Sequence, residues 1–265
     1  MNIILPVIVV AGIGLLAGIL LAVLSKIMAV PVDEKEEAIT EVLPGANCGA
    51  CGFSGCSGYA AALSKGKTKD TGLCAPGGSE VSAHIAEIMG LAATEITPMA
   101  AVVRCIGNDG CAYKKMDYSG VSSCKMASQL FGGDKTCIYG CLGLGDCQRV
   151  CPYDAINICN GIAIVSPELC RACKKCVAEC PKGLIELMPK SETKAAVLCR
   201  NHDKAAMVKK ECEVGCLGCT KCVKTCPEGA ISMDNAVAVV DYNKCTGCEK
   251  CAEACPNNTI KMLNK

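Results

Sequence analysis

Hydrophobic and polar positions divide the chain into an apolar N-terminal run and a longer remainder of short patterned segments. Residues 3–24 are uncharged and overwhelmingly apolar, and a helix of this length can cross about 30 Å of hydrocarbon. The first basic residue, Lys26, follows the run, so the positive-inside rule places the remainder in the cytoplasm. We predict a single transmembrane anchor. A cleavable signal peptide, the alternative, normally has a positive segment before its apolar core.

The remainder carries short helical and strand patterns. A polar helical connector begins at Asp33 and is stopped by Leu43-Pro44-Gly45. The other patterned segments are helical at 57–65 and 81–99, and strand-like at 161–165 and 236–240. This mixture predicts a chain of the α+β class.

Composition changes the picture, because the 265 residues include 26 Cys, no Trp and only 2 Phe. The cysteines recur in fixed short runs, and two residues between neighbours leave little freedom for disulfide pairing. Metal ligation must therefore supply folding energy that small apolar cores cannot. The net charge of +1 excludes neither an acidic nor a basic partner. No segment resembles a nucleic-acid-binding module, and the few aromatics make base stacking unexpected, so we expect no nucleic-acid partner.

Two cysteine runs near the C-terminus have the spacing of a pair of iron–sulfur clusters. Each reads Cys-x2-Cys-x2-Cys-x3-Cys-Pro, over 216–227 and over 245–256. Three closely spaced thiolates bind one [4Fe–4S] cluster, and the fourth Cys, before proline, reaches the other. The predicted ligand sets are Cys216, Cys219, Cys222 and Cys255, and Cys226, Cys245, Cys248 and Cys251. Zinc, the alternative, usually takes two separated Cys pairs without a crossed fourth ligand.

The same arrangement occurs 75 residues earlier, since segments from Cys124 onward align without gaps at this offset. Such self-similarity indicates a tandem repeat. The first copy departs where Leu144 replaces the equivalent of Cys219. We expect Cys137, just upstream of Cys141, to supply the missing ligand, and a three-Cys cluster is the alternative. The predicted sets are Cys137, Cys141, Cys147 and Cys180, and Cys151, Cys170, Cys173 and Cys176.

A further group precedes the repeat: Cys48-Gly-Ala-Cys51-Gly-Phe-Ser-Gly-Cys56, followed by Cys74. Its four thiolates suit another [4Fe–4S] cluster, and the intervening glycines let backbone N–H groups approach the sulfurs. The helix expected from Ser57 begins at this group, where its dipole favours anionic ligands. A structural zinc knuckle is the alternative.

These sets supply ligands for five [4Fe–4S] clusters and leave six cysteines over: Cys105, Cys111, Cys124, Cys159, Cys199 and Cys212. Cys159 lies at the tip of a predicted hairpin and is most simply a free thiol. Cys105, Cys111 and Cys124 are candidates for a sixth cluster with a distant fourth ligand. Buried free thiols, which are common, are the alternative.

The predicted organisation is α+β, with one transmembrane helix, a small α-rich [4Fe–4S] domain and two tandem dicluster ferredoxin-like domains. The expected boundaries are 1–30 for the anchor, 31–95 for the first iron–sulfur domain, 96–136 for a Cys-containing bridge, 137–190 for the first dicluster domain and 191–265 for the second. No His, Ser or carboxylate constellation indicates a catalytic site. The clusters would carry the redox chemistry.

The anchor, the Cys48–Cys74 group and the tandem diclusters, in this order, resemble the B subunit of the Rnf complex in its longer, clostridial-type form. The resemblance covers nearly the whole chain. That family belongs to a membrane-bound ferredoxin:NAD oxidoreductase that couples electron flow to Na⁺ or H⁺ translocation. The resemblance implies an electron-transfer subunit of an oxidoreductase, which has no complete active site of its own.

The resemblance also implies partners and a location. Reduced ferredoxin would donate electrons, and other subunits with iron–sulfur centres and flavins would receive them. Residues 3–24 would lie in the lipid bilayer of the cell membrane, with the C-terminal iron–sulfur region in the cytoplasm. No Gly-rich dinucleotide fingerprint stands in the chain, which agrees with NAD reduction on a different subunit.

Two other functions are compatible with the pattern. One is a polyferredoxin-like relay for another membrane enzyme, such as a hydrogenase or a quinone reductase. The other is a non-redox iron–sulfur scaffold or sensor. The Cys48–Cys74 group favours the ion-translocating complex. Redox titration by EPR would separate the scaffold, because a scaffold has no need of reversible low potentials.

Overall fold

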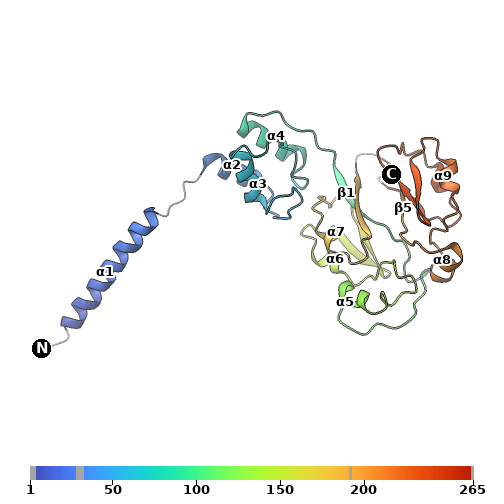
Figure 1. The fold of residues 1–265 in the computed structure, drawn as a ribbon, viewed down its shortest axis with the longest axis horizontal. Helices are drawn as coiled ribbons and strands as arrows, with labels where there is room; N and C mark the ends of the chain where they lie inside the picture. The colour runs from blue at the N-terminus through green and yellow to red at the C-terminus, as the bar shows by residue number, and fades with distance from the viewer. Residues whose placement is uncertain (1–3, 28–32, 191–192, 264–265) are drawn as a thin grey trace.

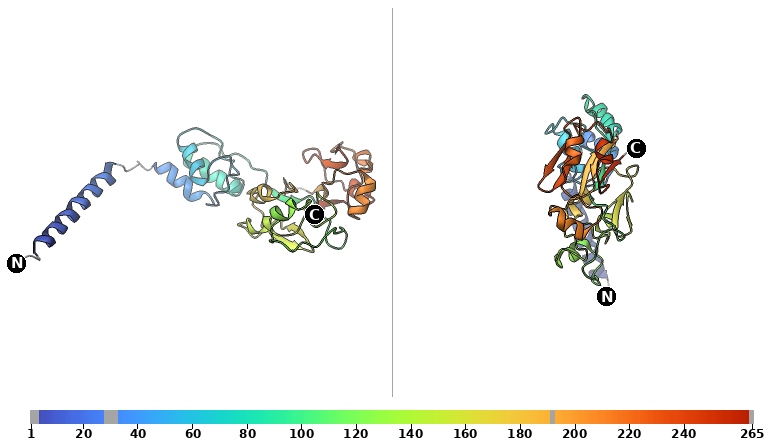
Figure 2. Two further views of the ribbon diagram at one scale, coloured as in Figure 1. Left: turned by 60° about the horizontal axis from the view of Figure 1, so that its bottom comes forward. Right: turned by 90° about the vertical axis from the view of Figure 1, so that its right-hand side faces the viewer.

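The computed structural model describes residues 4–27, 33–190 and 193–263. An N-terminal helix, α1 (Ile4–Ile27), lies apart from the remainder in Figure 1 and in the left view of Figure 2. Its described side chains, at position 8 and over 11–25, are all exposed. They include Leu15, Leu16 and Leu21, each more than 60% accessible. This part of α1 thus presents an apolar surface.

Over the described residues, no helix is both long and apolar enough to cross a membrane. The transmembrane helix predicted over residues 3–24 is therefore not confirmed and stays a prediction. Position 3 of that segment, and positions 1–3 and 28–30 of the predicted anchor, lie outside the described residues.

Three helices form the first folded unit: α2 (Glu34–Val42), α3 (Cys56–Ser64) and α4 (Gly78–Met89). Asp33 caps α2 by accepting a hydrogen bond from the backbone N–H of Lys35, as a helix N-cap residue does. Ile39, Leu63 and Ile85 are fully buried where the helices meet. The helical pattern predicted for residues 81–99 ends earlier than expected. Gly90 adopts φ 65° and terminates α4, as glycine commonly does at a helix C-terminus.

The first ferredoxin-like unit consists of two antiparallel strand pairs and three short helices. Strand β1 (Met99–Val103) pairs with β4 (Ile185–Pro189), and β2 (Ile156–Cys159) pairs with β3 (Ile162–Val165). The helices are α5 (Cys124–Gln129), α6 (Asp146–Arg149) and α7 (Lys175–Glu179). Strand β1 lies inside the segment 96–136 that was predicted to be a bridge, so this unit begins upstream of residue 137.

The second ferredoxin-like unit repeats this plan. Strand β5 (Lys194–Val197) pairs with β8 (Ile260–Leu263), and β6 (Ile231–Asp234) pairs with β7 (Val237–Val240). Its helices are α8 (Ala205–Glu211), α9 (Lys221–Thr225) and α10 (Lys250–Glu253). Strands β3 and β7 occupy the two segments predicted as strands. From β2 to β4 the first unit matches the second at an offset of 75 residues.

The two ferredoxin-like units pack against each other along β1 and β5. Val102 and Met188 from the first unit form an apolar cluster with Ala196 and Leu198 from the second. Beside this cluster lies Arg104, which is only 6% exposed. Its guanidinium crosses from the first unit into the second, as described below.

Candidate metal centres

One cavity of the second unit is lined by four cysteines: Cys216, Cys219, Cys222 and Cys255, here called set 4. Gly218 turns the loop with φ 61°, and a Cβ there would lie 2.7 Å from the carbonyl oxygen of Ala236, so only glycine fits this approach. Burial, then the neighbouring thiols of this set, raise the pKa of Cys222.

The four remaining cysteines of the two C-terminal runs also lie together: Cys226, Cys245, Cys248 and Cys251, here called set 5. Burial, then the thiols of Cys245, Cys226 and Cys248, raise the pKa of Cys251 to about 11. The backbone N–H of Ala230 donates to the Cys226 sulfur at 3.3 Å. The structure thus brings the fourth Cys of each run to the opposite run, the crossed arrangement of a dicluster ferredoxin.

In the first unit, a corresponding group comprises Cys151, Cys170, Cys173 and Cys176, here called set 2. Burial, then the thiols of Cys173, Cys170 and Cys151, raise the pKa of Cys176 to about 12. Strand β1 covers this group, since the backbone N–H of Ala101 donates to the Cys170 sulfur at 3.3 Å.

The other group of the first unit differs from the expected ligand set. One cavity is lined by Cys124, Cys141, Cys147 and Cys180, here called set 3. Burial, then the thiols of Cys141, Cys124 and Cys180, raise the pKa of Cys147 to about 12. The structure does not bring Cys137 to this group. Cys124 occupies the fourth position instead, from outside the cysteine run.

Asp146 explains how Cys124 reaches set 3. Asp146 is the first residue of α6. Its carboxylate accepts hydrogen bonds from the Ser123 hydroxyl and the Lys125 backbone N–H, each at 3.0 Å, and pairs with Arg149. Burial opposes its charge, yet these hydrogen bonds lower the pKa of Asp146 overall. The start of α5 is thereby fixed beside α6, which carries Cys147. Leu144 in the sequence indicates that one ligand is missing from the first cysteine run. No local spacing in the sequence predicts that Cys124 takes its place.

The N-terminal unit gathers Cys48, Cys51, Cys56 and Cys74, here called set 1. Burial raises the pKa of Cys74 to about 11, with further contributions from the thiols of Cys56, Cys48 and Cys51. Asn47 Oδ1 accepts the backbone N–H of Cys56 at 2.9 Å. Gly55 has φ 134°, and a Cβ there would lie 2.8 Å from Asn47 Oδ1. Glycine is therefore required where the loop enters α3.

Set 1 faces set 2 across the boundary between the N-terminal unit and the first ferredoxin-like unit. Cys48 and Cys173 line the same open cavity. Lys175 spans the boundary and donates to the carbonyl oxygen of Ala46 at 3.3 Å. Within the first unit, the Cys176 thiol of set 2 also contributes, after burial, to the raised pKa of Cys147 in set 3. Sets 1, 2 and 3 thus follow one another through the molecule.

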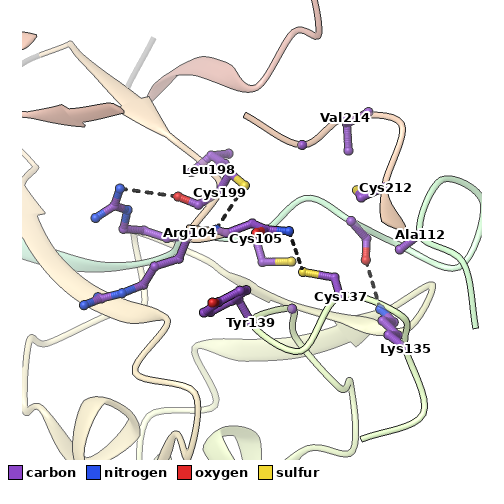
Figure 3. A pocket seen from close by; sticks show the side chains of 15 residues that line it. Arg104, Cys105, Ala112, Lys135, Cys137, Tyr139, Leu198, Cys199, Cys212 and Val214 are labelled. Atoms are coloured by element: carbon purple, nitrogen blue, oxygen red, sulfur yellow. Dashed lines mark hydrogen bonds between the residues drawn. The ribbon is translucent and has the colours of Figure 1, made fainter. Parts of the chain in front are cut away.

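Six cysteines remain outside these five sets. Cys105, Cys137, Cys199 and Cys212 line one cavity between the two ferredoxin-like units (Figure 3). Cys111 donates to Asn108 Oδ1 at 3.3 Å, and Cys159 is exposed at the end of β2. The expected grouping of Cys105 with Cys111 and Cys124 is therefore not the one the structure shows.

The chemistry of the five sets follows from their burial. In sets 1, 2, 3 and 5 one thiol has a pKa near 11 or 12, so it stays protonated at neutral pH and metal binding must displace the proton to create the thiolate ligand. Among the residues the structure describes, no three His, Cys, Asp or Glu side chains converge closely enough to hold a single metal ion. Four-cysteine groups of this kind fit a larger group such as a [4Fe–4S] cluster, which is bound by four thiolates.

Comparison with protein families agrees with these groups. A family described as an Fe-S cluster domain matches residues 43–76, which contain set 1. Two families described as 4Fe-4S dicluster domains match residues 169–230 and 206–262. The second of these ranges contains every cysteine of sets 4 and 5.

Curated relatives extend the likeness to most of the chain. The B subunit of the Na(+)-translocating ferredoxin:NAD(+) oxidoreductase complex of Acetobacterium woodii is 41% identical, over 91% of this chain and 72% of the relative. The B subunit of the proton-translocating complex of Clostridium ljungdahlii is 39% identical, over 91% and 84%. The B subunit of the ion-translocating oxidoreductase complex of Methanosarcina acetivorans is 40% identical, over 89% of each chain. With four-cysteine groups in the expected order and this coverage, the chain belongs to the family of B subunits of ion-translocating (Rnf) oxidoreductase complexes.

Proposed function

We propose that this chain is the electron-relay subunit of a membrane-bound, ion-translocating ferredoxin:NAD⁺ oxidoreductase. It would accept electrons from reduced ferredoxin and pass them to other subunits while the complex moves Na⁺ or H⁺. The observation that carries the proposal is the succession of four-cysteine sets through three packed units. Family membership, with relatives named for ferredoxin:NAD(+) oxidoreductase complexes, supports it.

Each of sets 1 to 5 would hold one [4Fe–4S] cluster, and set 3 would use Cys124 in place of Cys137. When bound, such clusters take up and release single electrons at potentials that hydrogen bonds to sulfur and solvent exposure adjust. The chain's own groups supply those adjustments. Backbone N–H groups of Ala101, Leu184 and Ala230 point at the sulfurs of Cys170, Cys180 and Cys226, at 3.3–3.5 Å.

The domain division follows the same units. We propose an anchor over 1–30, an iron–sulfur domain over 31–95 and a second dicluster domain over 191–265, as the sequence predicts. The first dicluster domain would begin at β1 rather than at residue 137, because β1 completes its sheet and covers Cys170.

Ferredoxin would deliver electrons to the second unit. Cys219 of set 4 and Cys248 of set 5 are exposed, whereas the cysteines of sets 1, 2 and 3 are buried or half-buried. Lys221 and Lys224 are exposed on α9, next to set 4. In the first unit, Lys175 and Lys182 use their amines in hydrogen bonds to backbone carbonyls, and the exposed Arg171 and Lys174 lie next to set 2, whose cysteines are buried or half-buried. Bacterial ferredoxins are usually acidic, so the exposed basic face on α9 would steer their approach.

Reversing this charge tests the docking face. In the Lys221→Glu/Lys224→Glu variant, stopped-flow reduction by reduced ferredoxin should be about tenfold slower at low ionic strength, because steering contributes that much or more. The rate should also depend less on salt, while iron content is unchanged. Lys65→Glu/Lys67→Glu, on exposed residues of the N-terminal unit, makes the same charge change and should leave the rate alone. Equal rates and salt slopes in both variants would place docking elsewhere.

Helix α1 would anchor the subunit in the cell membrane, with the cluster-binding units in the cytoplasm. The proposal rests on the apolar run at 3–24 and on the exposed apolar side chains of α1. Burying them in lipid would remove a large apolar surface from water.

Deleting residues 1–30 should therefore yield a protein that remains in the supernatant after ultracentrifugation and keeps its brown colour. The reason is that the first cysteine is Cys48, so no ligand is lost. The full-length chain, expressed alone, should sediment with membranes. A truncated protein that still sediments, or that loses iron relative to the full chain, would contradict the anchoring role.

A further inference from the structure

Between the two ferredoxin-like units lies a cavity whose wall contains four cysteines outside sets 1 to 5. Cys105 and Cys137 come from the first unit, and Cys199 and Cys212 come from the second. Figure 3 shows their side chains arranged around the cavity. Cys137, Cys199 and Cys212 are buried, and Cys105 is half-buried. We call these four residues the junction set.

The cavity matches those of the cluster-binding sets in size and construction. The cavities of sets 4 and 3 are similar in size to the junction cavity. Backbone approaches the sulfurs closely here too. A Cβ on Gly107 would lie 3.1 Å from the Cys212 sulfur, which is tighter than side-chain packing ordinarily allows.

The junction set consists of two equivalent pairs, one from each unit. Cys105 follows β1 with one residue, Arg104, between, and Cys199 follows β5 with one residue, Leu198, between. Cys137 and Cys212 correspond at the 75-residue repeat offset, and each is followed three residues later by a glycine whose N–H donates back to its carbonyl. Two copies of the same structural unit thus each supply two thiols to one cavity.

Hydrogen bonds to sulfur in the junction set resemble those in sets 2, 3 and 5. The backbone N–H of Cys141 donates to the Cys105 sulfur at 3.4 Å. Asn201 donates twice, from its backbone to Cys199 at 3.5 Å and from its side chain to Cys137 at 3.4 Å. Donors of this kind stabilise thiolate ligands of iron–sulfur clusters.

Buried charge at the junction favours an anionic occupant. Arg104 and Lys135 both line the cavity, at 6% and 1% exposure. Lys135 donates to the carbonyl oxygens of Gly107 and Gly161, each at 2.9 Å, and neither of these partners carries charge. Glu211, hydrogen-bonded to Asn201 at 2.6 Å, is a buried carboxylate beside them. Arg104 also pairs with Glu186 at 3.4 Å, so the buried ammonium of Lys135 is the charge that an anionic cluster with four thiolates would balance.

We propose that Cys105, Cys137, Cys199 and Cys212 hold a sixth [4Fe–4S] cluster, which connects the electron paths of the two ferredoxin-like units. Cys105 accepts the N–H of Cys141 from set 3, and Cys199 accepts the N–H of Cys216 from set 4. The junction set is therefore bonded directly to a ligand residue on either side. At each transfer the donor side loses one electron and the acceptor side gains it, and no covalent bond forms or breaks. This connecting role rests on the relay function proposed above.

Iron and acid-labile sulfide analysis of the full-length protein tests the site. Six clusters require about 24 iron atoms per chain, and five require about 20. The Cys199→Ser/Cys212→Ser variant should lose about four iron atoms and the matching share of the integrated EPR signal of the reduced protein. The control, Cys111→Ser/Cys159→Ser, should lose none. A wild-type protein with about 20 iron atoms, or with one zinc ion in addition, overturns the proposal. The iron content of the wild-type protein tests the proposal even if the Cys199→Ser/Cys212→Ser variant does not fold.

Ferredoxin reduction tests the connecting role separately. In the wild-type protein the visible absorbance of all clusters should bleach in the fast phase after mixing with reduced ferredoxin. In Cys199→Ser/Cys212→Ser the amplitude of the fast phase should fall to roughly two fifths of the total bleaching, because only the two clusters of the second unit, out of the five that remain, would be reduced quickly. An undiminished fast fraction, in a variant that has lost the iron, would overturn the connecting role. If ferredoxin bleached no cluster of the wild type, the proposed function would fail, while the iron count would still decide the site.

Discussion

Replacing Cys124 by alanine should remove one cluster from the first ferredoxin-like unit and interrupt the path between sets 2 and 4. The variant is expected to lose about four iron atoms and four sulfides per chain, because Cys124 lines the same cavity as Cys141, Cys147 and Cys180. Iron and sulfide analysis with EPR spin integration would measure the loss. Cys159→Ala, on an exposed thiol, is the matched control and should retain all of its iron.

Combining this change with Cys137→Ala separates the structure from the prediction made on sequence alone. Cys124 and Cys137 line different cavities, so the double variant should lose about eight iron atoms, twice the loss of either single variant. If Cys137 served set 3, as the cysteine spacing suggested, Cys124→Ala would lose no iron and the double variant would lose only about four. That result would return Cys137 to set 3.

The two assignments of Cys137, one from cysteine spacing and one from the structure, show how far the sequence can predict the sites. The grouping of the cysteines in sets 4 and 5 could be predicted, because they lie in two runs whose spacing allows few arrangements. Cys137 was assigned by the same local reasoning, since it is the nearest thiol upstream of Cys141. Such reasoning cannot find a cysteine that comes from an insertion, as we propose for Cys124. The first unit has extra residues between β1 and Cys137, and Asp146 holds the start of α5, with Cys124, beside α6.

The fold was predictable to a similar degree. The strands β3 and β7 follow from alternating apolar residues between cysteine runs, and the 75-residue repeat implies two equal units. Strand β1 was missed because its partner, β4, lies more than 80 residues away, so nothing near Met99 in the sequence marks it. For the same reason the equivalence of Cys105 and Cys199 is visible only once β1 and β5 are placed. The 75-residue offset between equivalent positions does not extend to these strands, because the first unit has extra residues between β1 and its first cysteine run.

Arg104→Met should destabilise the contact between the two ferredoxin-like units by about 3 kcal/mol, because it removes a buried cation that several groups share. The guanidinium donates to the carbonyl oxygens of Val197, Cys199 and Ala238 at 3.2–3.4 Å. It also pairs with Glu186 at 3.4 Å. Methionine fills similar space, so the substitution removes mainly polar interactions. The three carbonyl oxygens lose a hydrogen-bond donor. Glu186 loses its cationic partner and, among the described residues, keeps the hydrogen bond from the Tyr242 hydroxyl at 2.8 Å.

The destabilisation can be followed as the rate at which clusters are lost in guanidinium under anaerobic conditions, since proteins with bound cofactors seldom unfold in a reversible two-state manner. A loss of about 3 kcal/mol corresponds to a rate up to roughly a hundredfold faster, if the interaction is broken in the rate-limiting step. Arg171→Met replaces an exposed arginine of the first unit and should change the rate little. Arg104→Lys should recover only part of the stability, because one ammonium cannot reach four acceptors that a planar guanidinium spans. Equal rates for Arg104→Met and Arg171→Met would show that Arg104 does not hold the two units together.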